Sequence, residues 1–270
     1  MNWPALDVHG CEPDLVLALV DDHSPTAAET FPDTFRLFFR SADQRNAARR
    51  ALASAGVTAE PLDVPDEDWA RRSQEGLEPV TVGRMTIFPS QESLADRSAE
   101  AFALRMTVRP SMGFGTGHHA TTRLCLRALQ EIDLEGRTVL DVGTGSGVLA
   151  IAASLLGAAS ARGIDFDPDA IQSAGENLAL NPAARAVTFQ VADLAGGPLE
   201  PADVVIANLT GAALLRHAGA LASAVNPGGT LVMSGLLETE RADVLRAFSN
   251  TTVGAESSED GWAAIVVKKQ

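Results

Sequence analysis

Three glycines stand at alternate positions between two apolar stretches of the chain: Gly143, Gly145 and Gly147. Glycine lets the backbone turn sharply and lie against a ligand without a Cβ in the way. The apolar residues on either side predict a strand over 138–142 and a helix over 147–156. A strand, a glycine loop and a helix in this order are typical of the nucleotide-binding crossing of open α/β folds.

Two ligands compete for this loop. Gly145, Gly147 and Ala150 also match the fingerprint of dinucleotide-binding loops, so glycine spacing leaves NAD open. Asp141 could hold a methionyl ammonium group, and it would repel a pyrophosphate. We expect Asp165, at the end of the next strand, to accept hydrogen bonds from ribose hydroxyls, and Asp193, after the third, to accept from an adenine amino group. Three carboxylates favour the cationic, phosphate-free S-adenosylmethionine.

A second glycine-rich segment precedes the first and runs into an apolar helix. We expect it to lie over the cofactor, with threonine hydroxyls capping the helix that follows. The adjacent His118 and His119 could suggest a metal, but no third ligand is nearby and no metal site is predicted. A general-base role for either histidine stays open. The cofactor contacts predicted from this segment are Phe114, Gly115, Thr116 and Gly117.

Asn208 ends an expected strand over 204–207, at the edge that faces the reactive end of a bound adenosyl ligand. Its amide could orient the cofactor or an incoming amine, and we assign it the catalytic role of orienting substrate or methyl group. Methyltransferases of base or glutamine amide nitrogens carry Pro-Pro and an aromatic residue after this position. Here Leu209 follows and the chain has no tyrosine, so a planar amide lacks its clamp. No obligate base is assigned.

The order of elements predicts an α/β fold with a mostly parallel sheet from about residue 120, preceded by a small α+β unit. We expect domains at 1–90 and 111–270 with a linker at 91–110, the first recognising the substrate. The remaining predicted strands are 34–40, 57–64, 80–88, 161–166, 187–191 and 230–233, with an extended segment at 105–110 and a hairpin over 251–267. The remaining predicted helices are 42–55, 94–104, 167–180, 211–225 and 238–248.

Composition bounds the functional classes. The chain has 270 residues and a formal net charge of −14, which argues against direct nucleic-acid binding. This charge is compatible with a basic partner, and solubility alone also accounts for it. Two distant cysteines fit a reduced cytoplasmic setting. No apolar run is long enough to span a membrane.

These residues together resemble the PrmA-type family, the methyltransferases of ribosomal protein L11. The resemblance covers roughly residues 62–267 and includes an acidic-Trp segment at 66–69, Pro-Ser at 89–90 and Ser-Gly-Leu-Leu at 234–237. It implies a seven-stranded class I methyltransferase domain, Rossmann-like, behind a smaller substrate-recognising domain. It also implies an enzyme that transfers methyl groups to lysine ε-amines of a basic protein, with an N-terminal α-amine as a further candidate target. We expect the enzyme to act as a monomer. The cofactor contacts that it implies are Thr122, Gly143, Asp165 and Asn208.

Some positions depart from the family pattern. His118 and Ala120 stand where members carry Thr and Pro. Three alternatives therefore stay open at this point: lysine methylation of another basic protein, methylation of a small molecule by the same fold, and a noncatalytic or NAD-linked protein. The extra N-terminal unit argues against a small substrate, and the absence of tyrosine argues against a Tyr-Lys oxidoreductase.

Overall fold

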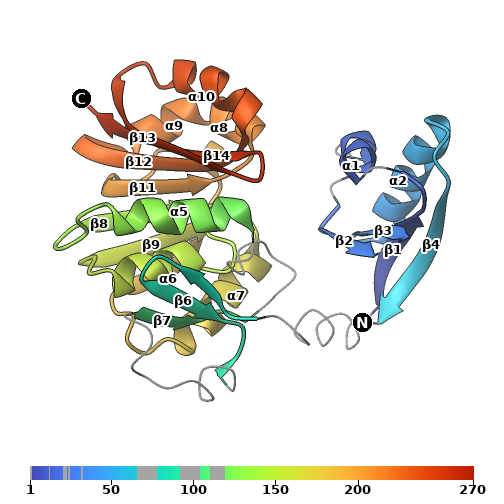
Figure 1. Cartoon of the computed structure of the whole chain (residues 1–270), viewed down its shortest axis with the longest axis horizontal. Coiled ribbons are helices and arrows are strands. Elements are labelled where there is room, and N and C mark those ends of the chain that lie inside the picture. The colour runs from blue at the N-terminus through green and yellow to red at the C-terminus, as the bar shows by residue number, and fades with distance from the viewer. Residues whose placement is uncertain are drawn as a thin grey trace. The chain divides into compact units, whose positions relative to one another are not determined.

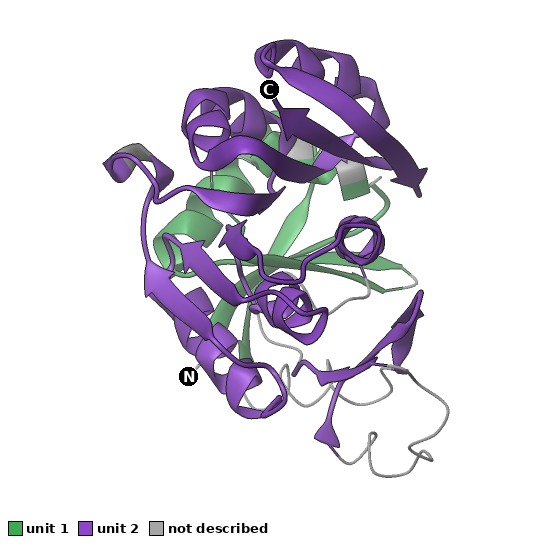
Figure 2. Cartoon of the chain, turned by 90° about the vertical axis from the view of Figure 1, so that its left-hand side faces the viewer, with its two compact units in different colours: residues 1–77 green, residues 78–270 purple. Residues whose placement is uncertain are grey.

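The chain divides into two compact units, residues 1–77 and 78–270 (Figure 2). The computed structural model describes residues 2–11, 13–20, 23, 25–31, 33–65, 78–91, 104–109 and 119–270. The expected helix at 94–104 lies outside these residues except for Leu104, as does the acidic-Trp segment at 66–69.

The first unit is a four-stranded antiparallel sheet with strand order β2-β3-β1-β4 and two helices. Both helices contribute side chains to one apolar cluster with the sheet. Its elements are β1 (Asn2–Val8), α1 (Pro13–Val20), β2 (Ala27–Phe31), β3 (Thr34–Phe38), α2 (Ala42–Ser54) and β4 (Ala59–Pro65).

The predicted elements at 34–40, 42–55 and 57–64 are confirmed as β3, α2 and β4. Helix α2 begins where the Ser41 side chain accepts the Gln44 N–H, and it buries Ala48 and Leu52. Strand β1 was not predicted. It contains Pro4 and yet lies between β3 and β4, a position where proline is unusual because it cannot donate to the sheet.

The second unit contains a seven-stranded sheet with strand order β10-β9-β8-β11-β12-β14-β13. Every adjacent pair from β10 to β12 is parallel, and β14 runs antiparallel to both of its neighbours. Its strands are β8 (Thr138–Val142), β9 (Ser160–Asp165), β10 (Val187–Val191), β11 (Ala202–Asn208), β12 (Val225–Leu237), β13 (Thr251–Glu259) and β14 (Trp262–Lys269). Its helices are α5 (Ala120–Gln130), α6 (Val148–Leu155), α7 (Pro168–Ala179), α8 (Gly211–Arg216), α9 (Ala218–Ser223) and α10 (Arg241–Ala247), with short 3-10 turns η3 (Leu194–Gly196) and η4 (Glu238–Glu240).

Helices cover both faces of this sheet, which makes three layers (Figure 1). Alternate residues of a strand serve opposite faces: Val139 of β8 belongs to the buried cluster that includes residues of α5 and α6, whereas Leu140 belongs to the cluster that includes residues of α8, α9 and α10. The predicted strands and the hairpin around Asp260–Gly261 are confirmed. The helix expected over 211–225 is instead α8 and α9, because the backbone at His217 (φ −106°, ψ 14°) leaves the helical conformation.

A separate three-stranded sheet, β5 (Val80–Val82), β6 (Met85–Phe88) and β7 (Leu104–Thr107), also belongs to the second unit. The strand expected over 80–88 is thus two strands joined by a turn at 83–84. They join the second unit rather than the expected 1–90 domain because Met85 and Ile87 share a buried cluster with Leu126 of α5. Strand β7 lies within the expected linker and pairs with β6.

None of the helices among the described residues has the length and apolar character needed to cross a bilayer.

Candidate functional site

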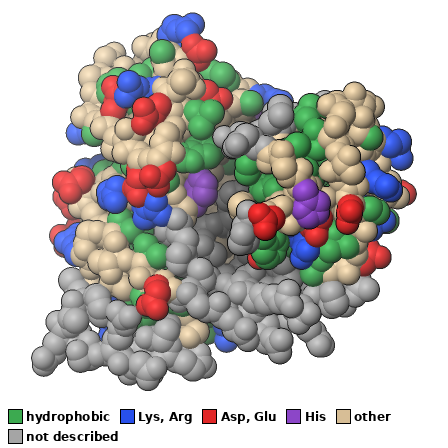
Figure 3. Space-filling model, turned by 45° about the vertical axis from the view of Figure 1, so that its right-hand side comes forward, with side chains coloured by type: hydrophobic (Ala, Val, Ile, Leu, Met, Phe, Trp, Pro, Cys, Tyr) green, Lys and Arg blue, Asp and Glu red, His purple; other side chains and the backbone are tan. Residues whose placement is uncertain are grey.

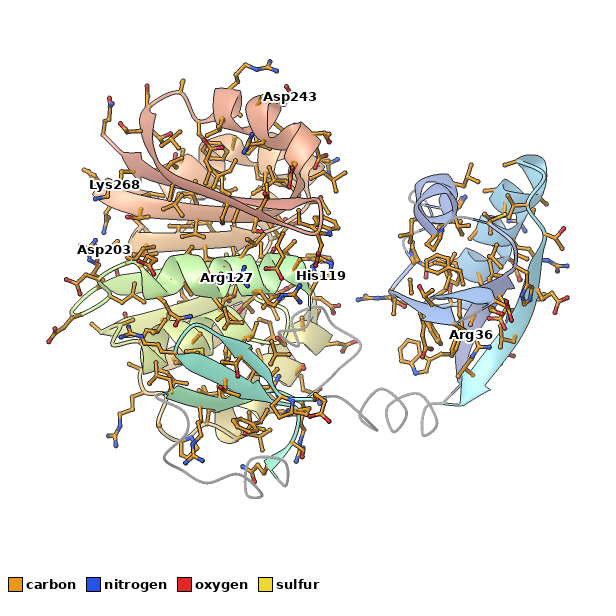
Figure 4. The ribbon with its side chains drawn as sticks, in the orientation of Figure 1. Arg36, His119, Arg127, Asp203, Asp243 and Lys268 are labelled. Carbon is orange, nitrogen blue, oxygen red and sulfur yellow. The ribbon has the colours of Figure 1, made fainter. Side chains whose placement is uncertain are left out.

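The candidate site lies at the carboxyl edge of the large sheet, where strand order reverses between β8 and β11. Open α/β sheets bind ligands at such a switch point, because the loops leaving the two strands diverge to opposite faces. Figure 4 shows the two ends of this sheet: Asp203, at the start of β11, lies at the end opposite to His119. The sheet order brings together the loops after β8, β9 and β11.

Close packing requires glycine at two positions of the loop after β8. Gly143 has φ +70°, and a Cβ there would lie 2.5 Å from Cδ2 of Leu209, the residue after Asn208. Gly147 has φ +80°, and a Cβ there would lie 2.7 Å from Cζ of Phe189 in β10. Side chains are strained at such φ values and would also meet these neighbours. The loop therefore lies directly between β9–β10 and the end of β11.

Asp141, near the end of β8, is 1% exposed and forms hydrogen bonds to the glycine loop and to the helix that follows it. Its Oδ2 accepts the Thr144 hydroxyl at 2.6 Å and the Ala150 N–H at 3.2 Å. Its Oδ1 is buried and has no hydrogen-bond partner among the described residues. Burial raises the pKa of this carboxyl to about 7, against the opposing effect of the Thr144 and Ala150 hydrogen bonds.

Asp165 ends β9, as predicted, and its carboxylate contacts two backbone segments. Oδ2 accepts the Gly145 N–H at 3.0 Å, and Oδ1 accepts the Asp167 N–H at 3.1 Å. A carboxylate offers about four lone-pair sites, so two remain for further donors. This arrangement suits a ligand that presents two adjacent hydroxyl groups.

Asn208 ends β11 beside Ser234 of β12. Its Oδ1 is buried without a hydrogen-bond partner among the described residues. The chain leaves the strand along a tight path: the Leu209 N–H donates to Ser234, and a Cβ on Gly235 would lie 2.4 Å from the Leu209 carbonyl oxygen. A buried acceptor without a donor costs free energy. Oδ1 of Asn208 is therefore available to accept a hydrogen bond from an amine or amide N–H of a ligand.

The other predicted contacts differ in how far the structure describes them. Thr122 is 1% exposed in the first turn of α5, and Asp193 is exposed two residues after β10. The four contacts predicted from the second glycine-rich segment lie outside the described residues: Phe114, Gly115, Thr116 and Gly117.

His119 caps the N-terminus of α5, a role that the sequence predicted for threonine hydroxyls. It is the N-cap of α5, where its Nδ1 accepts the Thr121 N–H at 3.4 Å and lies 2.8 Å from the Thr121 hydroxyl oxygen. Its ring stands edge-on to Trp262 with 5.1 Å between ring centroids. Burial, and then the charge of Arg123, lower the pKa of His119, and both effects favour the neutral imidazole.

Residues at the tip of the β13–β14 hairpin join the same helix through ion pairs. Nε of Arg123 donates to Glu259 at 2.6 Å, and Nη1 of Arg127 donates to the other oxygen of Glu259 at 2.6 Å. Burial opposes ionisation of Glu259, but the hydrogen bond from Arg123 and both positive charges prevail and lower its pKa. The hairpin tip, with Trp262, is thus fixed to the first two turns of α5.

Phe166 is a further candidate site residue that was not predicted from the sequence. It follows Asp165 directly and is 73% exposed, the largest value among the exposed large hydrophobic residues described. An exposed ring at a ligand-binding edge offers a face for stacking. The signal was present in the sequence as an aromatic residue between Asp165 and Asp167, where the strand ends.

The described residues fit an adenosyl ligand with an amino-acid tail. Asp141 and Asn208 each hold a buried oxygen without a donor, Asp165 has unused lone pairs, and Phe166 offers an open aromatic face.

Comparison with known proteins identifies the group to which this architecture belongs. The family model for ribosomal protein L11 methyltransferase (PrmA) matches residues 30–270. The chain belongs to the PrmA family. Members are S-adenosylmethionine-dependent methyltransferases, so the chain is an enzyme of that class and the NAD alternative is set aside.

Individual PrmA relatives extend over most of the chain. The ribosomal protein L11 methyltransferase of Azotobacter vinelandii is 38% identical over 94% of this chain and 84% of its own length. That of Thiobacillus denitrificans is 38% identical over 90% of this chain and 82% of its own. The solved structure of a ribosomal protein L11 methylase from Lactobacillus delbrueckii subsp. bulgaricus superposes with a TM-score of 0.65 at 25% identity, covering 72% of this chain and 100% of that one. The fold is that of a class I methyltransferase, as the sequence predicted.

Proposed function

We propose that this enzyme methylates ribosomal protein L11 on lysine ε-amines, and on the N-terminal α-amine where that group reaches the site. The observation that carries the proposal is the PrmA match over residues 30–270, which includes both the glycine loop and Asn208. The Azotobacter and Thiobacillus relatives are named ribosomal protein L11 methyltransferase. An amine substrate also agrees with Leu209, which replaces the Pro-Pro-aromatic clamp of amide methyltransferases.

The proposed cofactor contacts fall into groups according to the part of the cofactor that each residue would bind. Asp165 would accept the ribose hydroxyls, and Phe166 would stack on the adenine, whose amino group would donate to Asp193. The free Oδ1 of Asp141 would accept from the methionyl ammonium group. The glycine loop would contribute Gly143, Gly145 and Gly147, and the first turn of α5 would contribute Thr122. The glycine-rich segment that precedes α5 would contribute the four contacts predicted from it: Phe114, Gly115, Thr116 and Gly117.

Positioning accounts for most of what the protein contributes to the transfer. S-Adenosylmethionine supplies a methyl group that its sulfonium already activates. Asn208 would accept a hydrogen bond from the incoming amine and aim its lone pair along the line of transfer. The amine must arrive without its proton, against a lysine pKa of about 10.4 in water. We assign no side chain to take that proton, and water at the mouth of the site would receive it.

The first unit would recognise the substrate protein. Its four-stranded sheet and two helices contain none of the described residues of the candidate site. The chain has a net charge of −14, which favours encounter with a basic protein through long-range attraction. Acidic and basic side chains are interspersed over the coloured part of the face shown in Figure 3. We propose that the enzyme acts as a cytoplasmic monomer without direct contact to nucleic acid.

Mass spectrometry tests the proposal. Purified L11 is incubated with the enzyme and S-adenosylmethionine, and gains of about 14 Da per methyl are mapped to lysines and the N-terminus. Asn208→Ala serves as the paired variant. Because Asn208 is both a predicted cofactor contact and the residue that orients the amine, we expect kcat to fall by a larger factor than the cofactor affinity measured by calorimetry. Unmodified L11 together with methylation of another basic protein would redirect the substrate assignment. Equal activity of Asn208→Ala and wild type would remove Asn208 from its role.

A further inference from the structure

Asn177 of α7 hydrogen-bonds two parts of the chain that are far apart in sequence. Its Nδ2 donates to the carbonyl oxygen of Ser146, in the glycine loop, at 2.9 Å. Its Oδ1 accepts the backbone N–H of Arg109, two residues beyond β7, at 2.9 Å. The side chain is 1% exposed, so water does not compete for either bond.

Asn181 lies one turn further along the helix and faces the same way. Its Oδ1 accepts the Thr107 N–H at 2.8 Å, and its Nδ2 donates to the Thr107 carbonyl at 2.6 Å and to the Asn177 carbonyl at 2.7 Å. The backbone donors and acceptors around both side chains fix which amide atom is nitrogen and which is oxygen. Asn181 thus hydrogen-bonds the last residue of β7, and Asn177 hydrogen-bonds the backbone just beyond it. Of the two, only Asn177 also bonds the glycine loop.

The glycine loop needs such outside contacts to keep its shape. Gly145 has φ +52° and Gly147 has φ +80°, and Ser146 lies between them at 1% exposure. Glycine populates many conformations, so the loop's own residues do little to select one. Asp165 fixes the loop at the Gly145 N–H, and Asn177 fixes it one residue later at the Ser146 carbonyl.

We propose that Asn177 is a positioning residue for the methyl donor, which holds the Ser146 peptide of the cofactor loop against the backbone that leaves β7. The three-stranded sheet β5-β6-β7 then has a role in catalysis: through Asn177 it supports the loop that binds the cofactor. This inference rests on the proposed assignment of the glycine loop to cofactor binding. Asn177 itself need not touch the cofactor.

The test compares Asn177→Asp with Asn181→Asp. Each variant keeps the oxygen that accepts a backbone N–H and replaces the amide donor by a second oxygen. In Asn177→Asp that oxygen faces the Ser146 carbonyl, whereas in Asn181→Asp it faces Thr107 and the helix. Melting temperatures are measured first, and calorimetric titrations with S-adenosylmethionine follow at a temperature where both variants are folded.

We expect both variants to melt below wild type, and only Asn177→Asp to bind the cofactor more weakly, by about tenfold, as loss of about 1.4 kcal/mol implies. Unchanged affinity in Asn177→Asp, or equal weakening in both variants, would overturn the inference. A wild-type chain that binds no cofactor would overturn the proposed function as well, so the two failures are distinct.

Amide exchange in the wild-type chain gives a second readout that needs no variant to fold. The Arg109 N–H has Asn177 as its acceptor, and the Thr107 N–H has Asn181. On addition of S-adenosylhomocysteine, NMR should show slower exchange at Arg109 and little change at Thr107. An Arg109 rate that the ligand does not alter would contradict the coupling through Asn177.

Discussion

The carboxylate of Asp165 accepts a hydrogen bond from the backbone N–H of Gly145, with 3.0 Å between Oδ2 and nitrogen. This bond joins the end of β9 to the middle of the glycine loop that follows β8. The residue proposed to bind the ribose therefore also helps to shape the loop that would receive the rest of the cofactor. Ligand contact and loop geometry depend on one side chain.

Asp165→Asn should weaken binding of S-adenosylmethionine by about tenfold to a hundredfold, because hydrogen bonds to a charged group contribute about 1.5–3 kcal/mol. Calorimetric titration measures the change. Asp203→Asn is the matched control: Asp203 also accepts a backbone N–H, from Thr138 at 2.9 Å, but at the opposite end of the sheet. An equal loss of affinity in the two variants would show that the effect is one of stability.

Gly143→Ala should reduce cofactor affinity, because a Cβ at this position meets Leu209 and strains a backbone at φ +70°. The strain alone should cost about 1–2 kcal/mol of stability. Gly136→Ala is the control, since Gly136 has φ +73° but no atom within 4 Å of the added Cβ. Chemical denaturation should show destabilisation in both variants, at least as large in Gly143→Ala, where Leu209 must also move. Calorimetry should show a loss of binding in Gly143→Ala alone. Normal binding by Gly143→Ala would contradict the close fit of loop and Leu209.

Asp141 should make the enzyme less stable as pH rises from about 4 to about 7. Its pKa is raised to about 7 in the folded state by burial, against about 3.9 in an unfolded chain. Over that interval the folded state keeps a proton that the unfolded state has released, so the free energy of unfolding falls with rising pH. Asp141→Asn lacks this dependence.

Urea denaturation at several pH values measures the difference in unfolding free energy between wild type and Asp141→Asn. The unfolding free energy of wild type minus that of Asp141→Asn should decrease between about pH 4 and 7 and should stay constant above about pH 7. A difference that is the same at every pH would show that Asp141 titrates as it does in water.

Glu259 should contribute stability with the opposite dependence. Burial opposes its ionisation, but the hydrogen bond and charge of Arg123, with Arg127, lower its pKa in the folded state. Its contribution is therefore present above about pH 4.3, the unfolded value, and is lost as pH falls through the lower folded value. Near neutral pH, the free energy of unfolding of wild type should exceed that of Glu259→Gln by less than about 1 kcal/mol, because the ion pairs of Glu259 with Arg123 and Arg127 are partly exposed.

Asp243→Asn is the control for Glu259→Gln. Asp243 pairs with Arg246 one turn away on α10, and both side chains are exposed. We expect denaturation to show no measurable change for this variant. If Glu259→Gln also left the free energy of unfolding unchanged at all pH values, the ion pairs between the hairpin tip and α5 would not contribute to stability.

Much of the fold followed from local patterns. The glycine loop, the alternation of strands and helices after residue 120 and the hairpin at Asp260–Gly261 depend on residues a few positions apart, and the structure confirms each of them. The predictions were incomplete where tertiary contacts override local preference. Strand β1 contains Pro4 in an interior position, and strands β5 and β6 join the second unit because their apolar residues are buried against α5.

The sequence by itself determined the family, the type of fold and the loop in which chemistry is expected, because these depend on short motifs and on hydrophobic periodicity. Only the tertiary structure decided which atoms meet. It paired His119 with Trp262 and Arg123 with Glu259, and it placed Asn177 between Ser146 and Arg109. The partners in these contacts lie between 31 and 143 residues apart. Sheet order and helix packing bring them together, and neither is encoded in any local stretch of the chain.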